Sequence, residues 1–197
     1  MSPTRLLAAY ERGVFPWYSA QQPILWWSPD PRMVLFPVEF RLSRSLNKTL
    51  RNGPFSTRLD HAFAETIRAC AAPRRSGPDT WLNAEMIRSY DKLHELGYGH
   101  SVETYRADRL VGGVYGIQLG NVFFGESMFS LERDASKVAL ARLVDECRAR
   151  DIKVIDCQVA SNHLASLGAR EVSRSQFVAL LRQHASRSPC GKWHDPG

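Results

Sequence analysis

The stretch from Leu110 to Ser130, LVGGVYGIQLGNVFFGESMFS, constrains the fold more than any other part of the chain. Its first half is rich in β-branched and aromatic residues, and Gly120-Asn121 is a turn signal followed by a second apolar run. We therefore expect two strands joined by a tight turn. Glycine weakens a strand unless a neighbour packs closely against its backbone, so the glycines of the first strand predict such a neighbour. These glycines are Gly112, Gly113 and Gly116.

The second strand of this hairpin places Glu126 directly after the apolar run Val122-Phe123-Phe124. Binding groups are often placed at the end of a buried strand, so Glu126 is a candidate site residue. The alternative is a solvated glutamate in a glycine-rich hairpin. The pattern alone leaves both interpretations open.

Composition places the chain among globular proteins that form a sizeable core. It has 197 residues, of which 44% are hydrophobic and 23% are charged. No run of about 18 apolar residues is present, and the N-terminus lacks the apolar region of a signal peptide. We therefore expect a cytoplasmic protein without a membrane span. The cysteines are scattered, show no zinc-binding spacing and are expected to be free thiols. They are Cys70, Cys147, Cys157 and Cys190.

The net charge of +6 and the isoelectric point near 9.4 favour a polyanionic partner such as nucleic acid. Arg44, Lys48 and Arg51 form a basic run within a predicted helix. This run is either a solvated helix face or a set of phosphate contacts.

The first part of the chain combines a short helix with a rigid aromatic segment. Ser2 and Pro3 are a typical helix start, and Gly13 ends that helix. The segment that follows contains Trp17, Trp26 and Trp27 among several prolines, which exclude a helix. We expect two of these three tryptophans in the core, and the segment could also present a stacking surface.

The remaining pattern predicts helices and strands that alternate along the chain, with no internal repeat. Strands are predicted over 33–36, 40–42, 101–106 and 153–158. Helices are predicted after caps at Asp60 and Asn83, over 134–150 and over 175–184. This order predicts an α/β (α+β) fold with a central mixed sheet covered by helices.

Asp156 and Gln158 are the second set of candidate site residues. Asp156 lies between Ile155 and Cys157 in a predicted strand, where a charge is rarely buried unless it is paired or used. Gln158 shares its face of the strand, and a carboxylate beside an amide can receive an ammonium group. The alternative is a structural ion pair between Asp156 and an arginine. A lone histidine is more often structural, so His100 and His163 are left out of the candidate site.

The chain resembles the leucyl/phenylalanyl-tRNA–protein transferases. The resemblance rests on motifs that follow in the family's order over most of the chain, and it is highly specific. These motifs are GVFPWYS (13–19), ILWWSPDPRMVL (24–35), TW (80–81), YxxLHxxGxxHSVE (90–103), LVGGVYG (110–116), FFGESMFS (123–130), ASKVAL (135–140), IDCQ (155–158) and HLASLGA (163–169). The stretch that precedes SPxRLLxAY in the family is absent here, and Ser161 stands where the family has asparagine.

The resemblance implies a monomeric cytoplasmic aminoacyltransferase that needs no cofactor and no metal. It would move Leu or Phe, and less well Met, from aminoacyl-tRNA to a protein with an N-terminal Arg or Lys. The product would be marked for degradation by the N-end rule. The fold implied is a small N-terminal domain over 1–32 and an acetyltransferase-like (GNAT) catalytic domain over 33–197.

The same resemblance assigns roles to individual residues. Asp156, Gln158 and Glu126 match the catalytic positions around the acceptor amine. The positions that bind substrate comprise aromatic residues, two of them near the terminal adenosine of the tRNA, and the walls of an apolar pocket. They are Trp17, Trp81, Tyr90, Val114, Met128, Leu140 and Ile155.

Two other functions compete with this interpretation. A coenzyme A-dependent acetyltransferase would have the same fold, but its pyrophosphate loop is not evident between Ser130 and Ala135. A non-catalytic RNA-binding module would explain the positive charge. It would not explain why Asp156 and Glu126 stand beside apolar strands.

Overall fold

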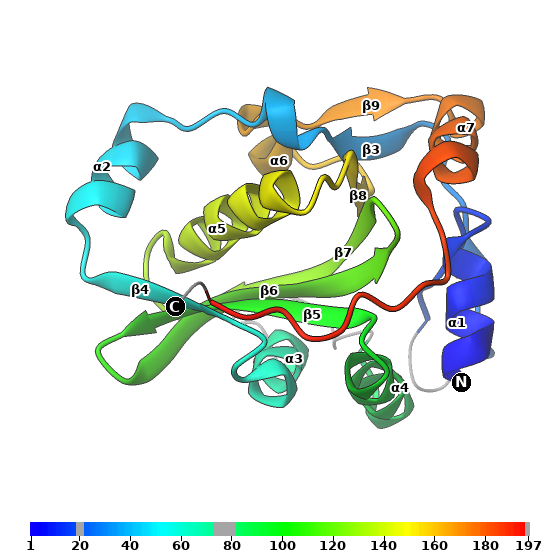
Figure 1. The fold of residues 1–197 in the computed structure, drawn as a ribbon, viewed down its shortest axis with the longest axis horizontal. Helices are drawn as coiled ribbons and strands as arrows, with labels where there is room; N and C mark the ends of the chain where they lie inside the picture. Colours follow the sequence, from blue (N-terminus) through cyan, green and yellow to red (C-terminus); the bar gives the residue numbers. More distant parts are fainter. Residues whose placement is uncertain (19–21, 73–81, 196–197) are drawn as a thin grey trace.

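The computed structural model describes residues 1–18, 22–72 and 82–195. Within these ranges, seven strands form one sheet in the order β4-β5-β6-β7-β8-β3-β9 (Figure 1). Only β7 and β8 pair in parallel; the other neighbours are antiparallel. The strands are β3 (Arg32–Leu35), β4 (Phe55–Leu59), β5 (Gly99–Arg106), β6 (Arg109–Leu119), β7 (Val122–Ser130), β8 (Val154–Gln158) and β9 (Arg170–Val172). A separate small ribbon pairs β1 (Phe15–Pro16) with β2 (Trp26–Trp27).

Helices cover both faces of the sheet. The long helix α5 packs on one face, and α3 and α4 pack on the other (Figure 1). The helices are α1 (Pro3–Tyr10), the 3-10 helix η1 (Pro37–Glu39), α2 (Arg44–Asn52), α3 (Phe63–Ala71), α4 (Ala84–Glu95), α5 (Ala135–Ala149), α6 (Asn162–Ser166) and α7 (Arg174–His184). The predicted α/β class with a central mixed sheet is therefore confirmed. Within the described residues, none of the helices has the length and apolar character needed to span a bilayer.

The predicted hairpin is the centre of the sheet. Leu119 pairs with Val122, and Gly120 adopts a positive φ of 55° in the turn between them. A Cβ on Gly112 would lie 2.6 Å from the Cβ of Ala135, the first residue of α5. A Cβ on Gly116 would lie 2.2 Å from the carbonyl oxygen of Phe124. The glycines therefore allow the close neighbours that the sequence predicted.

The sheet opens between its two parallel strands. β7 and β8 pair only where Val122–Phe124 faces Val154–Asp156. Opposite this point, the register between β6 and β7 shifts, so that Gly125 faces Gly116. Both strands continue beyond their paired section, and residues of each strand there line a cavity.

Three local predictions were wrong. Asp60 does not cap α3, because its backbone is left-handed (φ 50°) and its carboxylate instead accepts from the backbone N–H groups of Ser101 and Trp193. Residues 40–42 form no strand; the N–H of Arg41 bonds to the carbonyl of Leu167 in a loop. Two of the three tryptophans in the rigid aromatic segment were expected in the core, but only Trp26 packs against it.

Candidate active site

An apolar cavity of about 260 Å³ lies where β7 and β8 diverge. Its walls include all four residues that the sequence assigned to the pocket, supplied by β6, β7, α5 and β8. They are Val114, Met128, Leu140 and Ile155. Leu143 and Leu164 also belong to the apolar lining. The cavity is below the roughly 300–1,000 Å³ of sites that hold a whole drug-sized ligand, so its size suits a single side chain.

Glu126 lies at the polar end of the cavity and is only 8% exposed. The hydroxyl of Tyr10 donates to its Oε1 at 2.8 Å, and the hydroxyl of Tyr90 donates to its Oε2 at 2.7 Å. The side-chain amide of Gln158 also donates to Oε1, at 3.1 Å. Helices α1 and α4 and strand β8 thus all contribute a donor to one carboxylate.

Burial raises the pKa of Glu126 to about 7, against the opposing effect of the hydrogen bonds from Tyr90 and Tyr10. Asp156 adds to this rise, and Arg32 opposes it. Burial also raises the pKa of both tyrosine hydroxyls well above the usual range, so they remain neutral donors. Glu126 therefore changes its charge near neutral pH.

Asp156 lines the same cavity but is bound by a buried arginine. Arg32 donates from Nε to Oδ1 at 2.8 Å and from Nη2 to Oδ2 at 2.6 Å, and both side chains are essentially inaccessible. The guanidinium lies 4.7 Å from the ring centroid of Phe15 and 4.6 Å from that of Phe177. The ion pair that the sequence analysis weighed as an alternative therefore exists.

Arg32 and Tyr10 are residues of this site that the sequence did not predict. Arg32 begins β3, which pairs with β8, and its Nη1 donates to the carbonyl of Gly13. The available signal was an arginine placed directly before an apolar strand in PDPRMVL. A buried carboxylate such as Asp156 requires a cation. Arg32 is 124 positions away in the chain, so the sequence could not show which cation this is.

Gln158 ends β8 in a backbone conformation that is uncommon for its residue type. Its φ is 66°, and its N–H donates to Oδ1 of Asp156 at 2.9 Å. The left-handed conformation carries strain that the surroundings must hold, and such residues cluster at functional sites. Asp156 therefore fixes the main chain of Gln158, while Glu126 accepts a hydrogen bond from its amide.

Aromatic residues flank the mouth of the cavity. Trp17 lines the cavity and is 44% exposed, and Trp27 beside it is 45% exposed. Their ring centroids are 5.9 Å apart, and the indole N–H of Trp27 donates to the carbonyl of Trp17. Trp81 lies outside the described residues.

Tyr90, which the resemblance assigned to substrate binding, lies against Glu126 and not in the lining of the cavity. Tyr90 is fully buried in α4 and does not line the cavity. Its hydroxyl donates to Glu126 and shares a hydrogen bond with the hydroxyl of Tyr10. Ser161, which departs from the family's asparagine, accepts from the N–H of Leu164 and caps α6.

Among the described residues, no group of three or more histidine, cysteine or acidic side chains is arranged to hold a metal ion. The loop before α5 carries Glu132, which pairs with Arg106 and Arg109. The loop therefore places an acidic residue shortly before the N-terminus of α5, which disfavours binding of a pyrophosphate there.

Comparisons with known proteins identify the family of the chain. The model of the leucyl/phenylalanyl-tRNA protein transferase family matches residues 34–182, and the model of its N-terminal domain matches residues 1–30. A leucyl/phenylalanyl-tRNA–protein transferase from Cellvibrio japonicus is 52% identical over 99% of this chain and 84% of its own length. One from Azoarcus sp. is 55% identical over 98% of this chain and 83% of its own.

Solved structures are more distant. A GCN5-related N-acetyltransferase from Kribbella flavida is similar with a TM-score of 0.42 and 10% identity, covering 83% of this chain and 58% of its own. The sequence relatives decide the assignment, since they are more than 50% identical to this chain over nearly its whole length. The chain belongs to the leucyl/phenylalanyl-tRNA–protein transferase family.

Proposed function

We propose that this protein transfers Leu or Phe, and less well Met, from aminoacyl-tRNA to the N-terminal amine of an acceptor protein. The observation that carries the proposal is one cavity with an apolar wall and a carboxylate–amide end. The acceptor begins with Arg or Lys, and the enzyme acts as a cytoplasmic monomer that marks proteins for N-end rule degradation. We retain the division into domains at residues 32 and 33.

The apolar wall selects the transferred side chain. Val114, Met128, Leu140 and Ile155 offer no polar group, so the pocket favours Leu, Phe and Met and discriminates only weakly among them. The exposed ring of Trp17 at the mouth stacks on the terminal adenosine, which is worth about 1–3 kcal/mol. Trp81 has the same role by its place in the family motif.

The reaction requires positioning and one proton acceptor. The donor is already an ester, and holding two reactants in place can lower the barrier by roughly 7–11 kcal/mol at best. The nitrogen of the acceptor amine attacks the ester carbonyl, an amide bond forms and the bond to the ribose oxygen breaks. The proton that the amine loses ends on that oxygen.

Glu126 is better suited than Asp156 to carry this proton. Both oxygens of Asp156 accept from Arg32, whereas the donors to Glu126 are neutral hydroxyl and amide groups. The pKa of Glu126 near 7 is close to the pKa near 8 of an α-amine, which suits proton transfer at neutral pH. Asp156 and Arg32 then hold Gln158 against the amine.

A transfer assay tests the proposal. The protein is incubated with Leu-tRNA or Phe-tRNA and a peptide that begins with Arg, and matched peptides begin with Lys, Ala or Glu. We expect product with Arg and Lys and little with Ala or Glu. Acetyl-coenzyme A in place of the charged tRNA tests the acetyltransferase alternative. Acetylation, or tRNA binding without transfer, would overturn the proposal.

A further inference from the structure

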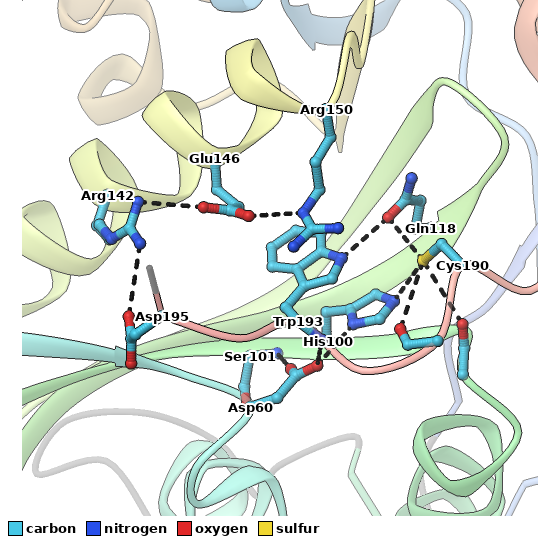
Figure 2. Close-up of polar contacts among 12 residues, drawn as sticks. Asp60, His100, Ser101, Gln118, Arg142, Glu146, Arg150, Cys190, Trp193 and Asp195 are labelled. Carbon is cyan, nitrogen blue, oxygen red and sulfur yellow. Dashed lines mark hydrogen bonds and ion pairs between the residues drawn. The ribbon is translucent and has the colours of Figure 1, made fainter. Parts of the chain in front are cut away.

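The segment after α7 forms a clasp over the sheet, defined here as residues 185–195. Figure 2 shows how it ties several elements together. The N–H of Cys190 bonds to the carbonyl of Gly97 at 3.2 Å, and the N–H of Trp193 bonds to Asp60 at 2.7 Å. Asp195 contacts Arg142 on α5 and the N–H of Leu59 on β4. The family match ends at residue 182, before the clasp begins.

Cys190 of the clasp and two side chains beneath it are arranged as a nucleophile, a base and a group that orients the base (Figure 2). Sγ of Cys190 lies 3.1 Å from Nε2 of His100. Nδ1 of His100 lies 2.8 Å from Oδ2 of Asp60. An activated nucleophile has this arrangement, with each pair within about 2.6–3.2 Å. None of the three belongs to the cavity described above.

The hydrogen bonds assign the tautomer of His100. An ionised carboxylate only accepts, so Nδ1 of His100 carries the proton that it donates to Asp60. Nε2 then presents a lone pair to the sulfur of Cys190. Trp193 stacks on the imidazole at 4.4 Å between centroids and 6° between planes, which fixes the ring.

Cys190 is an exposed residue whose sulfur is partly buried, and its thiol is neutral at rest. Cys190 is exposed, whereas Cys70 and Cys147 are buried. Burial of its sulfur raises the pKa of the Cys190 thiol, and burial lowers the pKa of His100. His94 on α4 and Arg150 on α5 also disfavour protonation of His100, and Asp60 favours it. Attack by the thiol therefore requires that its proton move to the imidazole.

We propose that Cys190, with His100 as its base, is a modification site for small disulfides of the glutathione class. Sγ of Cys190 attacks one sulfur of the disulfide, and its proton moves to Nε2 of His100. A new S–S bond forms, the original S–S bond breaks, and the leaving thiolate takes the proton. Cys190 is oxidised and the leaving sulfur is reduced, so the exchange balances.

Modification would loosen the clasp. The sulfur also lies 3.0 Å from Oε1 of Gln118, which accepts from the indole of Trp193 as well. A group attached to Cys190 cannot keep these contacts. The clasp contacts α5, the helix that carries Leu140 and Leu143 into the apolar cavity. We expect the mixed disulfide to lower the melting temperature, and dithiothreitol to restore it.

The test measures the rate at which the chromogenic disulfide DTNB modifies Cys190, followed by mass spectrometry of the peptide 188–192. The matched control is a synthetic peptide of the sequence SPCGK. A free thiol with a pKa near 8.5 gains thiolate about eightfold between pH 7 and pH 8. If the thiol gives its proton to neutral His100, its rate of reaction with DTNB should change less than twofold over the same pH range.

A second arm uses His100→Asn, which keeps a donor for Asp60 and removes the base. We expect Cys190 to react at least tenfold more slowly at pH 7 and to regain the steep pH dependence. A purely structural role for His100 predicts the opposite, because a loosened clasp would expose the thiol and speed its reaction. An eightfold rise in the natural protein, or an equal or faster rate in His100→Asn, would overturn the proposal.

Discussion

Arg32 and Asp156 form a bidentate ion pair that is sealed from solvent, with 2.6 Å between Nη2 and Oδ2. The pair joins β3 to β8, and its carboxylate also fixes the backbone N–H of Gln158. The same two side chains therefore stabilise the fold and shape the polar end of the cavity. A substitution at Asp156 acts on both at once.

We predict that Asp156→Asn destabilises the protein. The substitution leaves the Arg32 guanidinium buried without its counter-charge, which costs about 3–5 kcal/mol. Urea unfolding measures the loss. The sequence analysis left a structural ion pair open as the alternative to a site role, and the structure shows that this pair exists.

The control is the double variant Arg32→Met/Asp156→Asn, since a methionine between Phe15 and Phe177 removes the orphaned charge and keeps the aromatic contacts. We expect it to recover much of the lost stability. Equal stability of Asp156→Asn and the natural protein would show that the buried Arg32 guanidinium does not need Asp156 as its counter-charge.

The sequence predicted the parts of the fold that local chemistry decides. The hairpin follows from the Gly120-Asn121 turn, and α4 begins at Asn83, whose side chain accepts from the N–H of Met86 as expected of a cap. β4 was missed because its FSTRL sequence is half-exposed and lacks clear alternation, and β9 has only three residues.

The candidate site was predicted as far as residue types and family motifs reach. The four apolar residues that the resemblance assigned to the pocket wall all line the cavity. The contacts of Glu126 with Tyr10 and of Asp156 with Arg32 span 116 and 124 positions. Such pairs depend on how the sheet brings distant segments together, and no local pattern encodes them.

We predict that Met128→Trp reduces transfer of Phe more than transfer of Leu. Met128 lines the cavity, and an indole there fills space that the larger substrate ring requires. Single-turnover transfer of both amino acids measures the ratio. Leu131→Trp is the matched control, because Leu131 is 71% exposed and does not line the cavity. An unchanged Phe-to-Leu ratio in Met128→Trp would remove Met128 from the pocket wall.

We predict that tRNA binding weakens steeply with salt. The protein carries a net charge of +6, and phosphate contacts release counterions when they form. Affinity for charged tRNA should fall more than about tenfold between roughly 50 and 200 mM salt. Filter binding or fluorescence anisotropy measures this slope.

We expect helix α2 to contribute to the surface that binds tRNA phosphates, and so to part of the salt dependence of the affinity. Lys48→Gln and Arg51→Gln should reduce the salt slope, because both side chains extend from the basic run of that helix. Arg170→Gln is the control, since Arg170 already pairs with Glu39 at 3.0 Å. Equal slopes for all three variants would exclude α2 from the tRNA surface.

The last prediction concerns Glu126, whose pKa is raised to about 7 by burial. Between the unfolded pKa near 4.3 and the folded pKa near 7, the folded protein binds more protons than the unfolded chain. Stability therefore falls as the pH rises through this window and is constant on either side. At neutral pH and above, the free energy of unfolding is lower by about 3 kcal/mol than at pH 4.

Glu126→Gln isolates this contribution, because the amide keeps the shape and cannot ionise. The difference in unfolding free energy between the natural protein and Glu126→Gln should shift by about 3 kcal/mol across the window. Glu103→Gln is the control, since Glu103 also has a pKa near 7 but lies outside the cavity. Both variants should flatten the stability profile, and only Glu126→Gln should reduce transfer, by more than about tenfold.

Transfer by the natural protein should rise as the pH passes 7, where Glu126 becomes able to accept a proton. Full transfer activity in Glu126→Gln would remove Glu126 as the proton acceptor, whatever the stability profile shows.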